Sequence, residues 1–320
     1  MAPRVTDPAE LFALARGGDR LARARLLSLV ERGGEDARDV ARRAFPLSGT
    51  AYTVGMTGAP GAGKSTLTSA VIGHLRSLGL PVAVLAIDPS SPFTGGAILG
   101  DRVRMQDHAT DDGVFIRSMA TRGHLGGLSL ATSEAIRLLD ALGSPWILVE
   151  TVGVGQVEVE IAGKADTTVV VVNPGWGDAV QANKAGLMEV ADVFVINKSD
   201  RKGAAETQRD LEQMLDLSDL GENAWRPPIV QTTATTSTGV VELWDAVGRH
   251  REFMTSTGEL ERRRSVRLRG ELREVIERRL EDRARQICTG ARWDSLQEEV
   301  LAHRVDPWTA ADEMLKGVGG

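Results

Sequence analysis

Cysteine is almost absent from this 320-residue sequence, which contains a single one, Cys288. One thiol excludes an internal disulfide and is typical of a protein from a reducing compartment. Cys288 falls in a predicted C-terminal helix without a metal-ligating residue at ligand spacing. We therefore expect a small, buried apolar side chain there rather than a metal ligand.

Long apolar runs and excess positive charge are also missing. No apolar run approaches the ~18 residues that cross a bilayer. The apolar run at residues 11–15 ends at Arg16, so we expect no secretory signal. A net charge of -6 argues against a nucleic-acid partner. These absences favour a cytoplasmic protein without membrane contact, and 42% apolar residues support a large core.

The most informative segment that is present reads Thr-Gly-Ala-Pro-Gly-Ala-Gly-Lys-Ser-Thr, residues 57–66. It contains G-x-x-x-x-G-K-[ST], preceded by an apolar run at 52–56 and followed by helical spacing at 67–78. Lys64 would reach the β- and γ-phosphates and stabilise charge during transfer, and Ser65 would hold Mg²⁺. The predicted triphosphate-binding residues are Gly58, Ala59, Pro60, Gly61, Ala62, Gly63, Lys64, Ser65 and Thr66.

Alternating apolar runs and helical patterns predict an α/β fold, a mostly parallel, doubly wound sheet with helical extensions at both ends. We divide the chain into a helical N-terminal extension (1–48), a P-loop domain (49–255) and a helical C-terminal arm (256–320). The N-terminal helices can pack on the core or on a partner. The predicted strands lie near 52–57, 82–88, 114–118, 146–151, 168–173, 192–197 and 228–232. The predicted helices of the domain lie at 65–78, 101–110, 125–143, 180–190, 203–216 and 239–252.

Acidic residues lie at carboxyl ends of predicted strands, the edge where parallel sheets bind ligands. Asp88 can reach Mg²⁺ directly or through water, or serve as a turn residue before proline. Asp101 begins the next predicted helix as a second magnesium-linked carboxylate or as a helix cap. Glu150 ends an apolar strand in the form of a Walker B segment and would orient Mg²⁺. With Ser65, these three residues are the predicted metal site.

Gly153 follows Glu150 at the spacing of a switch segment, where its amide would sense the γ-phosphate. The next residue is Val154, whereas Ras-like enzymes have a water-positioning glutamine at that place. Valine cannot orient water, and Gln156 would replace that glutamine only if the loop bent inward. We therefore expect the isolated chain to turn over well below ~1 s⁻¹.

Residues 197–200 read Asn-Lys-Ser-Asp directly after an apolar strand. Asp200 would accept hydrogen bonds from N1–H and the N2 amino group of guanine, a donor pair that adenine lacks. Asn197 would tie the base to the P-loop, and the stem of Lys198 would lie over the ring. A third base-contacting loop is expected after the last predicted strand and comprises Thr233, Ala234 and Thr235.

These segments together resemble the MeaB/ArgK-type GTPases, the G-protein chaperones of adenosylcobalamin-dependent methylmalonyl-CoA mutase. The residues that carry the resemblance are 58–66, 88–91, 94–101, 150–156, 197–200 and 306–312. The resemblance implies a homodimer that uses GTP/GDP and Mg²⁺. It also implies gated cofactor loading and protection or reactivation of an acyl-CoA mutase, methylmalonyl-CoA mutase or a close relative. Hydrolysis would be slow alone and faster with the mutase.

The resemblance also assigns residues 174–178, Pro-Gly-Trp-Gly-Asp, to a loop that relays nucleotide state to the mutase. Asp178 and Gln181 join Gly153 and Gln156 as switch residues. Lys184 joins Lys64 and Glu150 as a catalytic residue, although without the resemblance it reads as a solvated helix lysine. Ala179 replaces the glutamate usual at its place, so the relay or the mutase served can differ.

The C-terminal arm carries an apolar stripe about every four residues, made of Leu268, Leu272, Ile276, Leu280, Ala284 and Ile287. By the resemblance, a second subunit covers it; the chain's own core is the alternative. The arginines at 262–264 lie among glutamates and predict a solvated face rather than a nucleic-acid site.

Two other functions stay open. One is a P-loop metallochaperone GTPase for nickel-enzyme maturation, which would need a Cys/His cluster, whereas this chain has one cysteine and five scattered histidines. The other is an ATP-dependent kinase linked to amino-acid transport, which the Asn-Lys-Ser-Asp segment opposes.

Overall fold

A computed structural model describes residues 7–88, 108, 110–120, 125–151, 163–175, 190–217, 221 and 224–316 of this protein. Its contacts divide the chain into two compact units, Met1–Arg267 and Leu268–Gly320. In the described residues, no helix is both long and apolar enough to cross a membrane. The predicted helices at 101–110 and 180–190 fall almost entirely outside the described residues.

The described part of the first unit contains a seven-stranded sheet in the order β3-β2-β4-β1-β5-β6-β7, and every neighbouring pair of strands is parallel. This confirms the predicted α/β sheet and its strands. The strands are β1 (Tyr52–Gly58), β2 (Val82–Asp88), β3 (Val114–Ala120), β4 (Trp146–Thr151), β5 (Thr167–Val172), β6 (Val193–Asn197) and β7 (Ile229–Thr232). Every residue of β1, β4, β5 and β6 is buried, as expected for strands covered on both faces.

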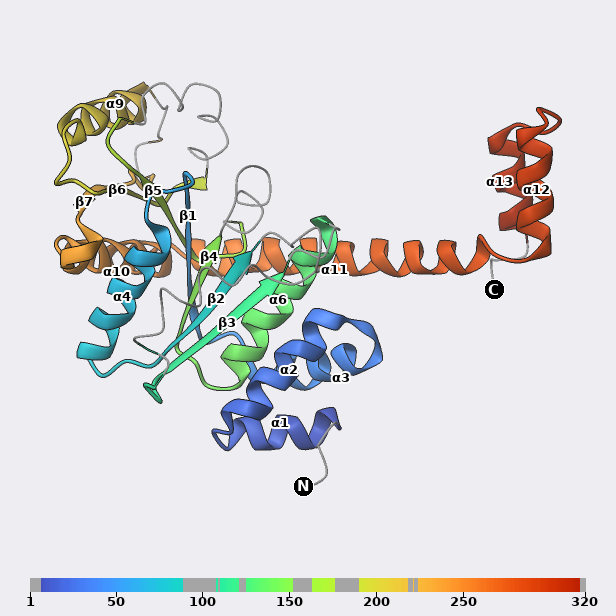
Figure 1. Cartoon of the computed structure of the whole chain (residues 1–320), viewed down its shortest axis with the longest axis horizontal. Coiled ribbons are helices and arrows are strands. Elements are labelled where there is room, and N and C mark those ends of the chain that lie inside the picture. The colour runs from blue at the N-terminus through green and yellow to red at the C-terminus, as the bar shows by residue number, and fades with distance from the viewer. Residues whose placement is uncertain are drawn as a thin grey trace. The chain divides into compact units, whose positions relative to one another are not determined.

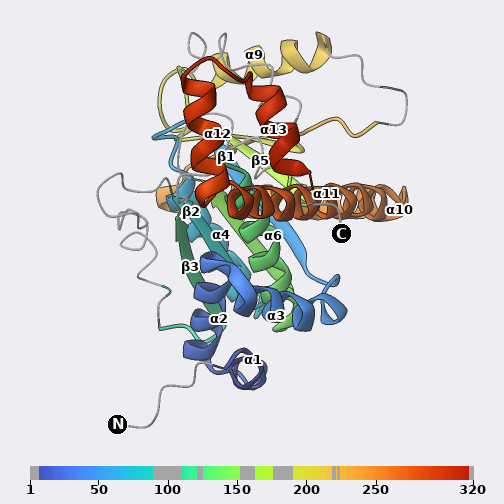
Figure 2. The ribbon, with the colours of Figure 1, turned by 90° about the vertical axis from the view of Figure 1, so that its right-hand side faces the viewer.

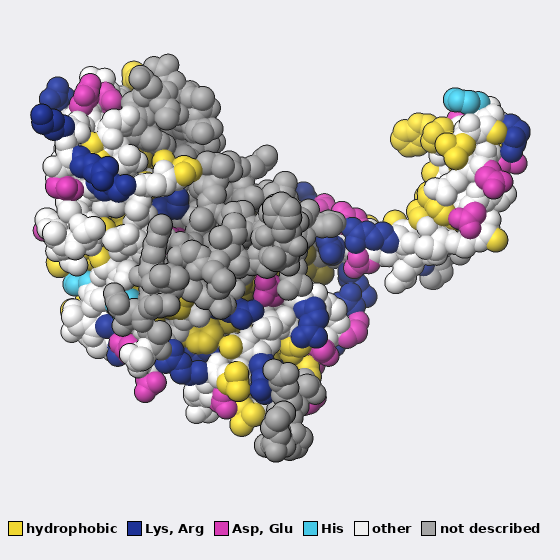
Figure 3. Space-filling model, viewed as in Figure 1, with side chains coloured by type: hydrophobic (Ala, Val, Ile, Leu, Met, Phe, Trp, Pro, Cys, Tyr) yellow, Lys and Arg dark blue, Asp and Glu magenta, His cyan; other side chains and the backbone are white. Residues whose placement is uncertain are grey.

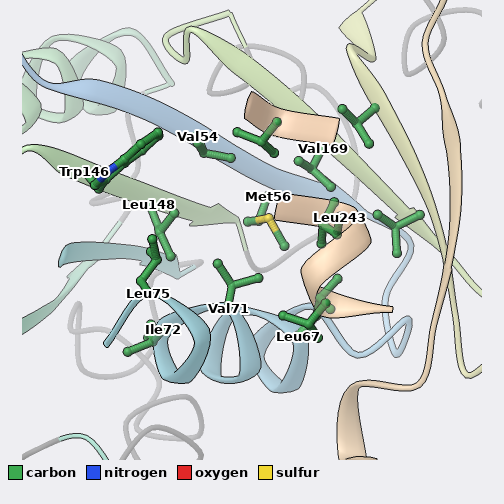
Figure 4. Packing of buried hydrophobic residues seen from close by; sticks show 14 of the residues in the cluster. Val54, Met56, Leu67, Val71, Ile72, Leu75, Trp146, Leu148, Val169 and Leu243 are labelled. Atoms are coloured by element: carbon green, nitrogen blue, oxygen red, sulfur yellow. The ribbon is translucent and has the colours of Figure 1, made fainter. Parts of the chain in front are cut away.

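Helices cover both faces of this sheet (Figure 1). On one face, α4 (Lys64–Ser77) and α10 (Val240–Ser256) pack on the central strands. Figure 4 shows the apolar side of α4 packed against β1, β4 and β5. The α4 residues in this contact are Leu67, Val71, Ile72 and Leu75. On the other face, α6 (Leu125–Ala141) covers β2 and β4, and α9 (Ala204–Leu217) covers β5 and β6. Both faces of the sheet are therefore shielded from water. The candidate nucleotide site lies at the carboxyl ends of the strands.

The N-terminal helices pack against the core. They are α1 (Pro8–Arg16), α2 (Arg20–Arg32), α3 (Gly34–Ala44) and the short η1 (Phe45–Leu47). Asp7 and Asp19 cap α1 and α2 by accepting backbone hydrogen bonds at 2.9 Å. Buried leucines of α1 and α2 join the cluster that includes α6. Arg117 on β3 pairs with Glu31 on α2 at 2.9 Å, which fixes this extension to the sheet.

The helix α11 (Glu259–Ile287) begins in the first unit, and there the expectation of a solvated arginine face is wrong for two residues. Arg264 Nη2 lies 2.6 Å from Oδ2 of Asp166, whose side chain is 2% exposed. Arg263 Nη1 lies 3.0 Å from Oδ1 of Asp192, which is also buried. The two aspartates directly precede β5 and β6. The helix α11 is therefore anchored at the amino ends of these strands, whereas the P-loop follows the carboxyl end of β1.

The second unit contains the rest of α11, α12 (Ala291–Leu301) and α13 (Pro307–Leu315), and Figure 2 shows α12 and α13 side by side. Its hydrophobic side chains gather over these helices in Figure 3, and they line a cavity of about 520 Å³. Cys288 lines this cavity but is exposed, so the expected buried cysteine is wrong. The α11 leucines and isoleucine of the apolar stripe are 45–62% exposed: Leu268, Leu272, Ile276 and Leu280.

Candidate nucleotide site

The P-loop leaves the sheet at the end of β1 and enters α4 at Lys64. Lys64 is 7% exposed, and its Nζ donates to the carbonyl oxygens of Gly58 at 2.6 Å and Ala59 at 3.2 Å. The ammonium group is thus held against the loop, beside the first amides of α4. Amides at a helix N-terminus together with a lysine form an anion site suited to phosphate.

At Gly63, which caps α4 with φ of 91°, there is room for the backbone but not for a side chain. A Cβ atom at Gly63 would lie 2.5 Å from Nδ2 of Asn197. That close approach brings the Asn-Lys-Ser-Asp segment directly against the phosphate loop. Glycine is therefore required for two reasons, the left-handed backbone and the contact with Asn197.

Ser65 and Glu150 meet at the foot of the P-loop. Ser65 Oγ donates to Glu150 Oε1 at 2.5 Å, and the exposed fractions of the two residues are 5% and 0%. A hydroxyl and a carboxylate are oxygen ligands of the kind that Mg²⁺ prefers, so the pair fits the predicted metal. In the described residues, no group of three or more His, Cys, Asp or Glu forms a metal site. The side chain of Asp88 and all of Asp101 lie outside the described residues, although Asp88 ends β2 as predicted.

Asn197 joins three segments of the site. Its Nδ2 donates to the Ala62 carbonyl oxygen at 2.8 Å, within the P-loop. Its Oδ1 accepts from Thr232 Oγ1 and from the backbone amide of Ala234, each at 3.1 Å. These bonds link residues 197–200, the base segment, to the P-loop, and the same side chain also positions the third loop. Lys198 adds a second link, because its Nζ donates to the Gly61 carbonyl oxygen at 2.6 Å.

Asp200 lies exposed at the end of this segment, beside the third loop. Thr233 Oγ1 donates to Asp200 Oδ1 at 3.4 Å and lies 3.3 Å from Ser199 Oγ. Ala234 begins the short helix η3 (Ala234–Thr236), which holds Thr235. An exposed carboxylate with an oriented oxygen can accept from two parallel donors on a planar base.

The structure brings together the P-loop, Ser65 with Glu150, and the base segment with the third loop. It does not describe the predicted switch and relay residues Gly153, Gln156, Asp178, Gln181 and Lys184. A buried hydroxyl pair that the sequence did not predict, Thr57 and Thr151, lies beneath the P-loop, with 3.2 Å between the two oxygens. Their position as polar residues at the ends of otherwise apolar strands is the signal by which they could have been found.

Comparison with known proteins agrees with this geometry. A sequence model described as "Methylmalonyl Co-A mutase-associated GTPase MeaB" matches residues 21–289. A protein of Pyrococcus abyssi whose name describes a GTPase is 51% identical over 313 residues, which are 97% of this chain and 97% of that protein. GTPase ArgK of Escherichia coli is 39% identical over 260 residues, which are 79% of this chain and 78% of ArgK.

Among solved structures, a protein described as a LAO/AO transport system kinase has the same fold, with a TM-score of 0.72 and 26% sequence identity. The match covers 99% of this chain and 100% of that one. The family match and these relatives therefore show that this chain belongs to the MeaB family of P-loop GTPases, which are described as associated with methylmalonyl-CoA mutase.

Proposed function

We propose that this chain binds GTP and GDP with Mg²⁺ and hydrolyses GTP slowly by itself. The three hydrogen bonds of Asn197, to Ala62, Thr232 and Ala234, carry the guanine-nucleotide part of this proposal. These bonds hold the base segment and the third loop at a fixed place beside the P-loop, so one nucleotide would contact all three. Asp200 then selects guanine, because an adenine base would leave this carboxylate without its donor pair.

Phosphate binding would draw the ammonium group of Lys64 from the Gly58 carbonyl oxygen to the β- and γ-phosphates. When bound, Mg²⁺ supplies positive charge to the phosphate oxygens. Ser65 and Glu150 would hold the metal, with Asp88 and Asp101 completing the site. Lys64 would stabilise the negative charge that develops on the γ-phosphate while water attacks.

We further propose that an adenosylcobalamin-dependent acyl-CoA mutase, methylmalonyl-CoA mutase or a close relative, is the partner whose cofactor loading and protection or reactivation this GTPase gates. The family description supports this partner. The switch residues Gly153, Gln156, Asp178 and Gln181 would carry nucleotide state to it, and Lys184 would act in the stimulated reaction. The C-terminal arm, residues 256–320, would form a homodimer, which the exposed apolar stripe on α11 supports.

Replacing Asp200 by Asn is expected to lower the affinity for GTP by roughly 10³-fold, because two hydrogen bonds to a charged acceptor are lost. Affinity for XTP should rise in the same variant, since xanthine presents a carbonyl oxygen where guanine has its amino group, and the Asn amide can donate to it. Competition against a fluorescent GDP measures both changes. Asp210→Asn, an exposed carboxylate on α9, is the matched control and should bind GTP normally.

Wild-type protein that preferred ATP to GTP in the same competition would contradict the proposed specificity. It would favour a kinase instead, the function named for the LAO/AO transport system protein that shares the fold.

Addition of an adenosylcobalamin-dependent methylmalonyl-CoA mutase is expected to accelerate GTP hydrolysis severalfold. The affinity between the two proteins should also differ between the GDP and GTP-analogue states, since only differential binding shifts an equilibrium. Phosphate release and calorimetry measure these effects. The Lys64→Ala variant, which lacks the phosphate-binding ammonium group, should show neither. Equal affinity in both nucleotide states, with unchanged turnover, would remove the mutase from the proposal.

A further inference from the structure

We propose that Thr151 is a positioning residue for GTP hydrolysis, an inference that rests on the GTPase activity proposed above. Its hydroxyl ties the strand that carries Glu150 to the strand that opens into the P-loop. Thr151 is the last residue of β4 and directly follows Glu150. Thr57 is the residue before Gly58 in β1. The two threonines thus lie next to the two parts of the site that must keep a fixed separation.

Backbone pairing alone does not join the strands at this point. In the described strands, the parallel register between β1 and β4 ends at the pair Met56 and Glu150. One residue further, Thr57 is paired with Val170 of β5, and Thr151 is paired with Ile87 of β2. The backbone pairing of β1 and β4 is therefore not continued at Thr57 and Thr151, and the contact between these two residues is made by their side chains.

The hydroxyl of Thr151 supplies that contact. Its Oγ1 donates to Thr57 Oγ1 at 3.2 Å and lies 3.5 Å from the Met56 carbonyl oxygen. The exposed fractions of Thr57 and Thr151 are 1% and 2%, so water does not compete for this bond. A hydrogen bond in such a low-dielectric place is stronger and better defined in direction than one at the surface.

The functional consequence follows from what each strand end carries. Glu150 accepts the Ser65 hydroxyl hydrogen bond at 2.5 Å, and Gly58 accepts the Lys64 bond at 2.6 Å. Loosening the threonine pair lets the Glu150 carboxylate move relative to the P-loop. Such a displacement of the carboxylate lowers the rate of hydrolysis, since catalysis depends on near-ångström placement of reacting groups. The proposed guanine contacts lie at the ends of other strands, β6 and β7, so we expect them to be unaffected.

The test compares Thr151→Val, Thr57→Val and the double variant in single-turnover hydrolysis of GTP, with GDP affinity and thermal unfolding measured in parallel. Valine matches the shape of threonine without its hydroxyl. We expect Thr151→Val to lower the rate by roughly tenfold while GDP affinity stays the same. The double variant should recover thermal stability, because neither hydroxyl is left without its partner, but it should not recover rate. Thr151→Ser keeps the hydroxyl and should restore the rate.

Thr132→Val is the matched control. Thr132 is fully buried on α6, and its hydroxyl has no hydrogen-bond partner in the described structure, so its loss should leave hydrolysis unchanged. A purely structural role for Thr151 predicts that rate follows stability and returns in the double variant, and that result would overturn the inference. If Thr151→Val hydrolysed GTP at the wild-type rate, the inference would also be overturned, but the proposed function would remain intact. A wild-type chain without GTP hydrolysis would overturn both.

Discussion

Gly58→Ala is expected to abolish nucleotide binding and to lower the unfolding temperature by about 10 °C, a loss of about 3 kcal/mol. Gly58 has φ of 134°, a conformation that residues with a Cβ rarely adopt. The added Cβ would lie 2.0 Å from the Val171 carbonyl oxygen, a backbone atom that cannot move without shifting β5. Strain and overlap therefore act together at the point where Lys64 is held.

Gly61→Ala is the matched control for this prediction. Gly61 belongs to the same loop and has φ of 71°, but a Cβ there meets no atom within 4 Å. Its cost should be limited to the left-handed backbone, about 1 kcal/mol. Calorimetric unfolding and binding of fluorescent GDP separate the two variants. If Gly58→Ala were as stable as Gly61→Ala and bound GDP normally, the contact with Val171 would not limit this site.

Asp166→Asn is expected to destabilise the first unit by about 3 kcal/mol at neutral pH, because one member of a buried ion-pair cluster loses its charge. Asp166 is 2% exposed and contacts Arg264 and Arg267 of α11. Its Oδ2 also accepts the backbone amide of Thr53 at 3.1 Å. Equilibrium unfolding in urea measures the change. An unchanged midpoint would show that solvent replaces the arginine contacts.

The effect of this substitution should depend on pH. Burial acts to raise the pKa of Asp166, but the hydrogen bond from Arg264 and the charges of Arg267 and Arg264 outweigh it, so the pKa lies below 3.8. A carboxyl whose pKa is lowered by folding stabilises the folded state above its unfolded pKa, and this contribution is lost as pH falls through the folded pKa. The difference between wild type and Asp166→Asn should therefore be full at neutral pH and shrink below about pH 4.

Asp112→Asn controls for the loss of a surface charge. The Asp112 side chain is fully exposed, and its contact with Arg20 is 3.4 Å long. Exposed pairs of this type contribute between ~0 and ~1 kcal/mol, so this variant should unfold close to wild type at all pH values. A shift as large as that of Asp166→Asn would mean that net charge, not the buried cluster, governs stability.

Much of the fold was predictable because its signals are local. The run at residues 146–149 and the run Thr167–Val172 are continuously apolar or β-branched, and strands of this kind are buried in parallel sheets. The glycine-rich loop and the Asn-Lys-Ser-Asp segment also follow local patterns, and the structure brings them into contact at Ala62. The order of strands was not predicted, because crossover connections permit several arrangements with the same local pattern.

Partners across long sequence separations were not predictable. The arginines of α11 read as a solvated face, since their nearest charged neighbours in sequence are glutamates. Arg264 instead contacts Asp166, which lies 98 residues away in the sequence. Cys288 was expected to be buried and is exposed. An apolar helix pattern predicts burial only where another surface covers the helix.

The sequence by itself determined that a strand, a glycine loop and a helix form a phosphate site, and that an Asn-Lys-Ser-Asp segment accompanies it. These features depend on residues that are close together along the chain, where backbone geometry fixes their arrangement. Only the tertiary structure decided that Asn197 bonds two loops at once, that Thr57 meets Thr151, and that α11 is anchored on buried aspartates. The reason is that parallel pairing places distant segments in contact, and no local pattern records which side chains then meet.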